Sequence, residues 1–247
     1  MVHRDLGQGR AVLLGQRHPQ PAHPRIPVGE HRIVLTDVRD RALVFVDGVP
    51  LGVAAPATPE LPVRGTGAVV RLEILVENLG RVNYGPGVGG HKGLPGPVLV
   101  DRRIVHGWAS TPIALQDWSV EELGLAVAAG SDVASSGAGG DTAASGAGGP
   151  STPDGPGFAT ATVPVESPAD TFLALPGSGR GLVWVNGFLL GRYWEIGPQV
   201  TLYCPAPLLR TGGSTVTVLE LDRSGGLLEL RDRPELGPPE EYVEEFD

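Results

Sequence analysis

Short apolar runs, separated by glycine, proline or asparagine, follow one another along most of the chain. In the first half they read IVLTDV, ALVFVDG, VVRLEILVEN and PVLVD. In the second half they read ATATVPV, FLALPG, GLVWVNG, VTLYC and STVTVLELD. Runs of this length, rich in β-branched residues and bounded by turn signals, predict the strands of β-sandwiches. The pattern predicts one helix, SVEELGLAV at 119–127, where Ser119 and Glu122 have the spacing of a capping box.

One pattern occurs twice, as ALVFVDGVPLG from residue 42 and as GLVWVNGFLLG from residue 181. Each copy contains a pair, Asp47-Gly48 or Asn186-Gly187, that favours a type I′ hairpin turn, in which both central residues have positive φ. Each copy therefore predicts a strand, a tight turn and a second strand. A long apolar strand with acidic residues at its end follows in both cases. We therefore expect two copies of one sandwich topology.

The segments between the predicted strands divide the chain into modules. Residues 1–27 contain four prolines and predict a poorly ordered leader. Residues 128–156, mostly Gly, Ala and Ser, predict a flexible linker because they cannot bury enough apolar surface to become ordered. The expected all-β modules are then 28–127 and 157–233. Residues 234–247 form an acidic tail.

Charge and composition narrow the classes of partner. The formal net charge is −9, which argues against nucleic acid as a partner because phosphate binding needs a basic face. The single cysteine, Cys204, allows neither an internal disulfide nor a cysteine zinc cluster. No apolar run reaches membrane-spanning length, and no signal-peptide pattern is present. We expect a cytoplasmic protein with no membrane partner and no cofactor.

No set of residues in the sequence has the arrangement of a catalytic or metal site. Glycoside hydrolysis needs two carboxylates roughly 5–10 Å apart. The acids that end predicted strands, Glu73, Glu77, Glu220 and Asp222, are interpreted as surface positions of alternating strands. GSGRG at 177–181 is not a nucleophile elbow, and no histidines have metal-ligand spacing. We expect no catalytic residue and no metal.

Aromatic residues gather around the second hairpin. Trp184 precedes the turn, and Tyr193 and Trp194 follow it. Two interpretations stay open: the rings stack on a sugar, or they form a core tryptophan and a tyrosine that hydrogen-bonds at the rim. Arg192 is a further candidate for contact with a sugar; the architectural alternative is that it stacks on an aromatic ring or pairs with Glu195.

Several of these runs resemble a known family. RGLVWVNGFLLGRYWEIGPQVTLYCPAPLLR resembles the C-terminal module of family 35 glycoside hydrolases, the β-galactosidases. RDRALVFVDGVPLG, LEILVENLGRVNYG and HKGLPGPVLVD resemble the all-β module that precedes it in that family. The resemblance covers residues 32–118 and 157–222 and implies galactose-binding-like jelly rolls. It also implies a separate (β/α)₈ barrel that carries both catalytic glutamates. Such a barrel takes about 250 residues, and no segment of this sequence resembles one.

The resemblance implies roles for a few residues. The GRVNYG loop of the family reaches towards the mouth of the barrel, so Arg81, Asn83 and Tyr84 are candidates to face it. The alternative for Tyr84 is a loop tyrosine that anchors a turn. Leu189 stands where the family usually has a polar residue, and Ser178 stands where a tryptophan is common, which weakens the case for a sugar platform. Trp108 matches a tryptophan that packs within its module.

Taken together, these features predict the accessory β-sandwich region of a β-galactosidase-type hydrolase, without hydrolytic activity of its own. Its expected partner is a catalytic barrel chain or a galactoside. Two alternatives stay open: an autonomous galactoside-binding module that uses Trp184, Tyr193 and Trp194, or a truncated remnant without function. The proline-rich leader stands where the family has further strands, which leaves open whether the first module is complete.

Overall fold

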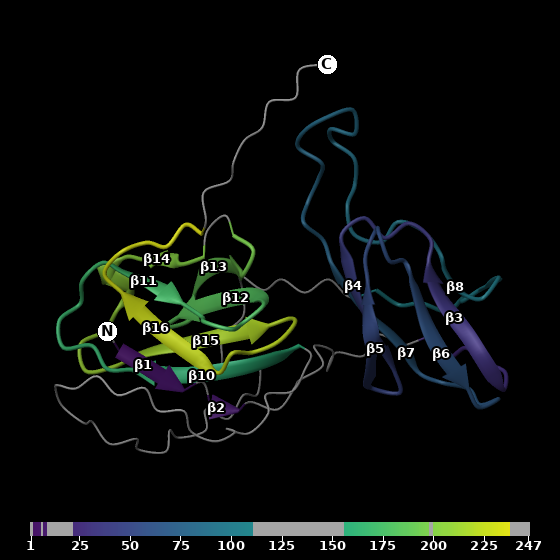
Figure 1. The fold of residues 1–247 in the computed structure, drawn as a ribbon, viewed down its shortest axis with the longest axis horizontal. Helices are drawn as coiled ribbons and strands as arrows, with labels where there is room; N and C mark the ends of the chain where they lie inside the picture. Colours follow the sequence, from purple (N-terminus) through teal and green to yellow (C-terminus); the bar gives the residue numbers. More distant parts are fainter. Residues whose placement is uncertain (1, 6, 9–21, 111–155, 198–199, 238–247) are drawn as a thin grey trace. The chain divides into compact units, whose positions relative to one another are not determined.

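The structure is a computed structural model, and it describes residues 2–5, 7–8, 22–110, 156–197 and 200–237. These residues form two compact units whose regular secondary structure is almost entirely β-strand, as predicted (Figure 1). The first unit comprises 22–110, and the second comprises the remaining ranges. The predicted helix, the predicted linker and most of the acidic tail lie outside the described residues. No helix in the described part is long and apolar enough to cross a membrane.

The first unit is a sandwich of two antiparallel sheets. One sheet has the strand order β6-β3-β8-β9 and the other has the order β5-β4-β7. The strands are β3 (Gly29–Leu35), β4 (Arg41–Val46), β5 (Val49–Ala54), β6 (Glu60–Gly65), β7 (Leu72–Glu77), β8 (Val98–Val100) and β9 (Arg103–Ile104). Alternate residues of these strands point inward. The core they form includes Ile33, Leu35, Val44, Leu72 and Val98.

The second unit is also a two-sheet sandwich, with the strand orders β1-β16-β11-β14 and β13-β12-β15-β10-β2. Its strands are β1 (Val2–Asp5), β2 (Gly7–Gln8), β10 (Gly157–Val163), β11 (Thr171–Ala174), β12 (Arg180–Val185), β13 (Phe188–Trp194), β14 (Leu202–Cys204), β15 (Ser214–Glu220) and β16 (Leu227–Arg231). A short 3₁₀ helix, Ala206–Leu208, follows β14. Val183, Val185, Val216 and Val218 form the centre of its core.

The expected repeat of topology is confirmed strand by strand. The order β6-β3-β8 in the first unit matches β14-β11-β16 in the second, and β5-β4-β7 matches β13-β12-β15. The two central hairpins turn as predicted: φ is 52° and 79° at Asp47 and Gly48, and 49° and 86° at Asn186 and Gly187. Both hairpins also have a register shift, between Val44 and Phe45 and between Val183 and Trp184, where the strand after the turn has one extra residue.

The first residue of each turn is held by the same pair of contacts. The Asp47 amide donates to the Arg71 carbonyl at 2.8 Å, and the Arg71 amide donates to Asp47 Oδ1 at 2.7 Å. Asn186 makes the equivalent contacts with Thr215, at 2.8 and 3.0 Å. The turn residue thus joins its hairpin to the third strand of the sheet, which explains why both copies have a short polar side chain there.

The prediction of a poorly ordered leader is wrong for its described part. Ala22 and Ile26 are buried in the first core, and the segment pairs along the edge of β7. The Leu72 amide donates to the Ala22 carbonyl at 2.9 Å, and the Val70 amide donates to the Pro24 carbonyl at 3.0 Å. Pro24 therefore serves as an acceptor, which needs no N–H of its own. In the second unit, β1 pairs with β16 and β2 with β10.

Candidate functional site

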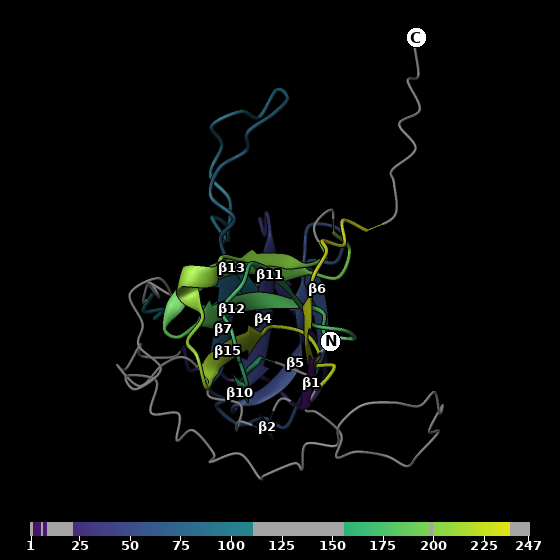
Figure 2. The same cartoon turned by 90° about the vertical axis from the view of Figure 1, so that its left-hand side faces the viewer.

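The most prominent surface feature of the first unit is loop 78–93. It makes up most of the connection between β7 and β8 and extends well beyond the ends of the strands (Figures 1 and 2). It contains the predicted candidates Arg81, Asn83 and Tyr84, and all three are exposed. Tyr84 has 89% of its surface exposed, and Val88 nearby is also an exposed apolar residue. Burial of these two side chains against another surface would be favourable, since each now exposes apolar area to water.

Hydrogen bonds across the loop give it a defined shape. The Val82 amide donates to the Gly90 carbonyl at 3.1 Å, and the Gly89 amide donates to the Val82 carbonyl at 2.8 Å. Arg81 Nη1 donates to the Gly89 carbonyl at 2.9 Å, and Arg81 forms an antiparallel bridge with His91. Part of the Arg81 guanidinium is therefore used within the loop. Arg81 holds the ribbon together, while Asn83 and Tyr84 are presented at its end.

Asp40, which the sequence did not single out, closes the base of this loop. Its almost wholly buried carboxylate accepts from the amides of Leu79 at 3.1 Å and Gly93 at 2.9 Å. Lys92 Nζ lies 3.5 Å from the other carboxylate oxygen. One side chain thus binds both ends of the loop. A pre-ordered loop loses less conformational entropy when it binds a partner than a mobile one does.

In the second unit, two of the aromatic candidates belong to the packed interior. Trp184 is 3% exposed and Tyr193 is 4% exposed. Trp184 packs near Phe158, with ring centroids 6.3 Å apart and planes inclined at 45°. Neither ring presents a face to solvent, so of the two open interpretations, the structure agrees with the core tryptophan and the hydrogen-bonded tyrosine.

The arginine that stacks on an aromatic ring is Arg180 and not Arg192. The Arg180 guanidinium carbon lies 4.4 Å from the ring centroid of the half-buried Trp194, which is a cation–π arrangement. Arg192 is exposed. The expected pairing of Arg192 with Glu195 is also wrong, because Arg223 forms the ion pair with Glu195.

Tyr193 leads to a buried carboxylate, Glu220, at the end of β15. The Tyr193 hydroxyl donates to Glu220 Oε2 at 2.6 Å. Oε1 accepts from the backbone amides of Arg180, Leu221 and Asp222 at 3.1, 3.0 and 2.8 Å. The interpretation of Glu220 as a surface acid is therefore wrong: it is 4% exposed. Its carboxylate joins β12, β13 and the end of β15.

The electrostatics of the pair follow from its burial. Burial raises the pKa of Glu220, and the hydrogen bonds from Tyr193 and the backbone act in the opposite direction. Burial and the charge of Glu220 raise the pKa of Tyr193. A signal for this position existed in the sequence, because period-two alternation places Glu220 on the same face as the core residues Val216 and Val218.

The remaining predicted acids also have structural contacts. Glu73 forms an ion pair with Arg71 at 2.7 Å. Glu77 Oε1 lies 3.7 Å from Arg41 Nη1, and the Glu77 side chain is only 9% exposed, so its interpretation as a surface acid is also wrong. Glu220 is enclosed by protein donors, which suits an architectural role better than proton transfer to a substrate. Among the described residues, no cluster of three histidine, cysteine or carboxylate side chains is placed to hold a metal.

Comparison with known proteins identifies both units. Residues 23–114 match the family model for the first all-beta domain of beta-galactosidase, and residues 156–214 match the model for its galactose-binding domain. The beta-galactosidase of Macaca fascicularis is 38% identical over 222 residues, which are 83% of this chain and 31% of that protein. The human beta-galactosidase is 38% identical over 196 residues, or 76% of this chain and 28% of that protein.

A third relative, the human beta-galactosidase-1-like protein 2, is 36% identical over 202 residues, which are 81% of this chain and 29% of that protein. The chain thus spans about 30% of the length of the curated relatives it matches. A solved lectin from Pleurotus ostreatus in complex with GalNAc has 14% identity and a TM-score of 0.26, and covers 86% of this chain and 72% of the lectin. That similarity is too low to support an inference about fold or ligand.

Proposed function

From the premise that this chain is the β-galactosidase-family region made of the first all-β domain and the galactose-binding domain, we propose that it is a non-catalytic accessory part of a glycoside hydrolase of that type. In this proposal it supports a catalytic (β/α)₈ barrel outside these 247 residues. The barrel supplies both catalytic carboxylates, and this chain supplies a docking surface. Loop 78–93 is the part of that surface nearest the substrate.

The observation that carries the proposal is the combination of order and exposure in loop 78–93. Its base is closed by Asp40, and hydrogen bonds hold its two sides together. Its end nevertheless leaves Tyr84 almost wholly in solvent. A tyrosine presented in this way supplies a large, rigid contact area with a polar tip, which is common at interfaces.

Sugar binding by this chain alone receives less support. Trp184 and Tyr193 are buried, and one face of Trp194 is covered by Arg180. The aromatic rings named as a sugar platform therefore offer little free face for a pyranose ring. Under this proposal they stabilise the second unit, and any contact with a galactoside comes from loop 78–93 once a barrel is present.

The proposal is tested by mixing the purified chain with the purified barrel domain of a related β-galactosidase. We expect association in biolayer interferometry and faster turnover of a chromogenic β-galactoside than with the barrel alone. Tyr84→Ala should weaken association at least tenfold, because it removes the aromatic anchor from the loop. Val69→Ala removes an exposed apolar side chain of the same unit outside the loop and should leave association unchanged.

Turnover by the chain without a barrel would contradict the accessory role. So would association that is equally strong with Tyr84→Ala and with the unchanged chain. Binding of galactose by the chain alone in titration calorimetry would favour the autonomous binding module instead.

A further inference from the structure

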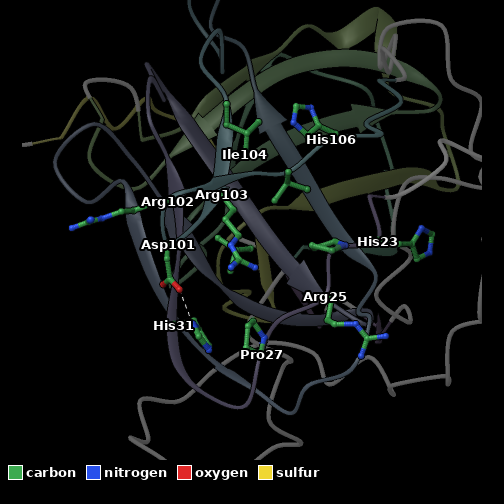
Figure 3. Close-up of a pocket in the computed structure, with 12 residues that line it drawn as sticks. His23, Arg25, Pro27, His31, Asp101, Arg102, Arg103, Ile104 and His106 are labelled. Atoms are coloured by element: carbon green, nitrogen blue, oxygen red, sulfur yellow. Dashed lines mark hydrogen bonds and ion pairs between the residues drawn. The ribbon is translucent and has the colours of Figure 1, made fainter.

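A cleft of about 570 Å³ lies in the first unit, between the segment that leads into β3 and the β8–β9 hairpin (Figure 3). The leading segment contributes His23, Arg25 and Pro27. The hairpin contributes Asp101, Arg103 and His106, and β3 contributes His31. Every lining residue belongs to the first unit. Loop 78–93 contributes none of them, so the cleft is separate from the proposed docking loop.

The charge of this cleft is opposite to that of the chain. Three arginines line it against a single carboxylate, a formal charge of 3 − 1 = +2 with histidine taken as neutral, whereas the whole chain has a formal net charge of −9 by the same convention. Three histidines add polar ring nitrogens to the lining. Arginines held close together repel one another, and this repulsion lowers the stability of the folded unit. A bound anion removes that repulsion.

Asp101, the one acid among the residues that line the cleft, makes hydrogen bonds that hold the β8–β9 turn to β3. It begins the β8–β9 turn with φ of 54°, and its Oδ2 contacts His31 Nδ1 at 2.7 Å. Its Oδ1 accepts from the Arg32 amide at 3.0 Å. These contacts lower the pKa of Asp101, chiefly through the hydrogen bond with His31. They also fix the turn against β3 and so hold Arg103 in place.

The arginines differ in how much of their hydrogen-bonding capacity is free. Arg25 Nη1 donates to the Gly67 carbonyl at 2.6 Å, which fixes its position and leaves its other N–H groups available. Arg103 makes no ion pair or hydrogen bond through its side chain among residues 22–110, and its side chain points into the middle of the labelled residues in Figure 3. Arg102, in contrast, points away from them.

We propose that this cleft is a binding site for a tetrahedral oxyanion, either a free sulfate or phosphate ion or the same group esterified to a sugar, with Arg103 as its main ligand and Arg25 and His23 around it. Guanidinium groups match such oxyanions because their N–H donors are planar and always charged. The site stands independently of barrel docking, because it uses none of the residues of loop 78–93.

Titration calorimetry of the full chain against inorganic sulfate, inorganic phosphate, galactose 6-sulfate and galactose tests the site. We expect the charged ligands to bind, more weakly as ionic strength rises, and galactose to bind at least tenfold more weakly than its sulfate ester. If only the ester binds, the source is a modified sugar. If the inorganic ions bind equally well, the source is the free ion. Failure of every charged ligand to bind overturns the proposal.

Variants separate the cleft from the general charge of the unit. Arg103→Gln should weaken oxyanion binding at least tenfold, and its exposed position makes loss of folding unexpected. Arg64→Gln removes an equal charge from an exposed position on β6, outside the cleft, and should leave binding unchanged. Asp101→Asn keeps an acceptor for the Arg32 amide and removes the one carboxylate among the residues that line the cleft. It should therefore tighten oxyanion binding. Equal effects of Arg103→Gln and Arg64→Gln would contradict the site, as would weaker binding by Asp101→Asn.

Discussion

Replacing Tyr193 by phenylalanine isolates the contribution of a buried hydrogen bond to a carboxylate. The change removes only the hydroxyl that donates to Glu220 Oε2 at 2.6 Å and keeps the ring in the core. Glu220 retains its backbone donors at Oε1. Because Glu220 is 4% exposed, water does not readily replace the lost donor.

The magnitude follows from that environment. Hydrogen bonds to charged groups contribute roughly 1.5–3 kcal/mol, and a buried group left short of a partner loses most of that. We expect Tyr193→Phe to lower the free energy of unfolding of the second unit by about 2 kcal/mol. With a urea dependence of about 1–3 kcal/mol per molar, the midpoint should fall by roughly 1 M.

The chain contains its own control. Tyr203 donates to Asp170 Oδ2 at 2.7 Å, which is nearly the same length, but Tyr203 is 46% exposed. Water can replace its hydroxyl, so Tyr203→Phe should lower the free energy of unfolding by less than about 1 kcal/mol. Hydrogen exchange of peptides from β12 and β15, followed as a function of urea concentration, measures the stability of the second unit separately from that of the first. Equal costs for the two variants would refute the argument from burial.

The sign of the pH dependence is also fixed. The hydrogen bond from Tyr193 lowers the pKa of Glu220, and burial raises it, with burial the larger effect. An acid with a raised folded-state pKa contributes stability that is present below its unfolded-state pKa, about 4.3, and is lost as pH rises through the folded value. Removal of the Tyr193 hydroxyl raises that folded value further. The cost of Tyr193→Phe should therefore be larger at pH 8 than at pH 4, and the reverse order would contradict the assignment.

Three further predictions test the other parts of the architecture. Glu220→Gln removes the titrating group, so its stability relative to the unchanged chain should improve as pH rises from 4 to 8 in thermal unfolding, and a constant difference would contradict the raised pKa. Gly187→Ala places a side chain at φ of 86° with no contact to compensate, and should cost about 1–2 kcal/mol in urea unfolding. Asp40→Ala removes the acceptor for Leu79 and Gly93, so exchange of their amides should accelerate at least tenfold while the core of the first unit stays protected.

Local signals in the sequence identified the parts of the fold that depend on neighbouring residues. The two I′ turns follow from Asp-Gly and Asn-Gly, and the long apolar strands follow from their alternation. The role of the segment around Pro24 could not be found in this way, since it depends on pairing with β7, far away in the chain. Burial of Glu220 was accessible from alternation, but its stabilising donors come from other strands and have no local signal.

Cross-strand pairing explains why Arg180, and not Arg192, contacts the aromatic ring. Arg180 lies directly opposite Trp194 in the β12–β13 pairing, and a register shift at Val183/Trp184 separates that pair from the turn. Arg192 lies opposite Leu182, which offers no ring. Without the shift, counting back from Asn186-Gly187 would place Arg180 opposite Tyr193 instead of Trp194, because one residue changes every later pairing. A repeat pattern therefore predicts that a hairpin forms more securely than it predicts which side chains meet across it.

The repeat also indicates where the two units differ in structure. Strands β3 to β8 match β11 to β16, and the hairpin turns are held in the same way in both. Among the connections between matched strands, the largest difference in length lies between the last two. Residues 78–97 join β7 to β8, whereas only 221–226 join the equivalent strands β15 and β16. An insertion at this point leaves the sandwich pairing unchanged and adds a loop whose ends need a new anchor, which Asp40 supplies. If loop 78–93 is shortened to a tight turn, the first unit should therefore keep its stability and lose its association with a barrel.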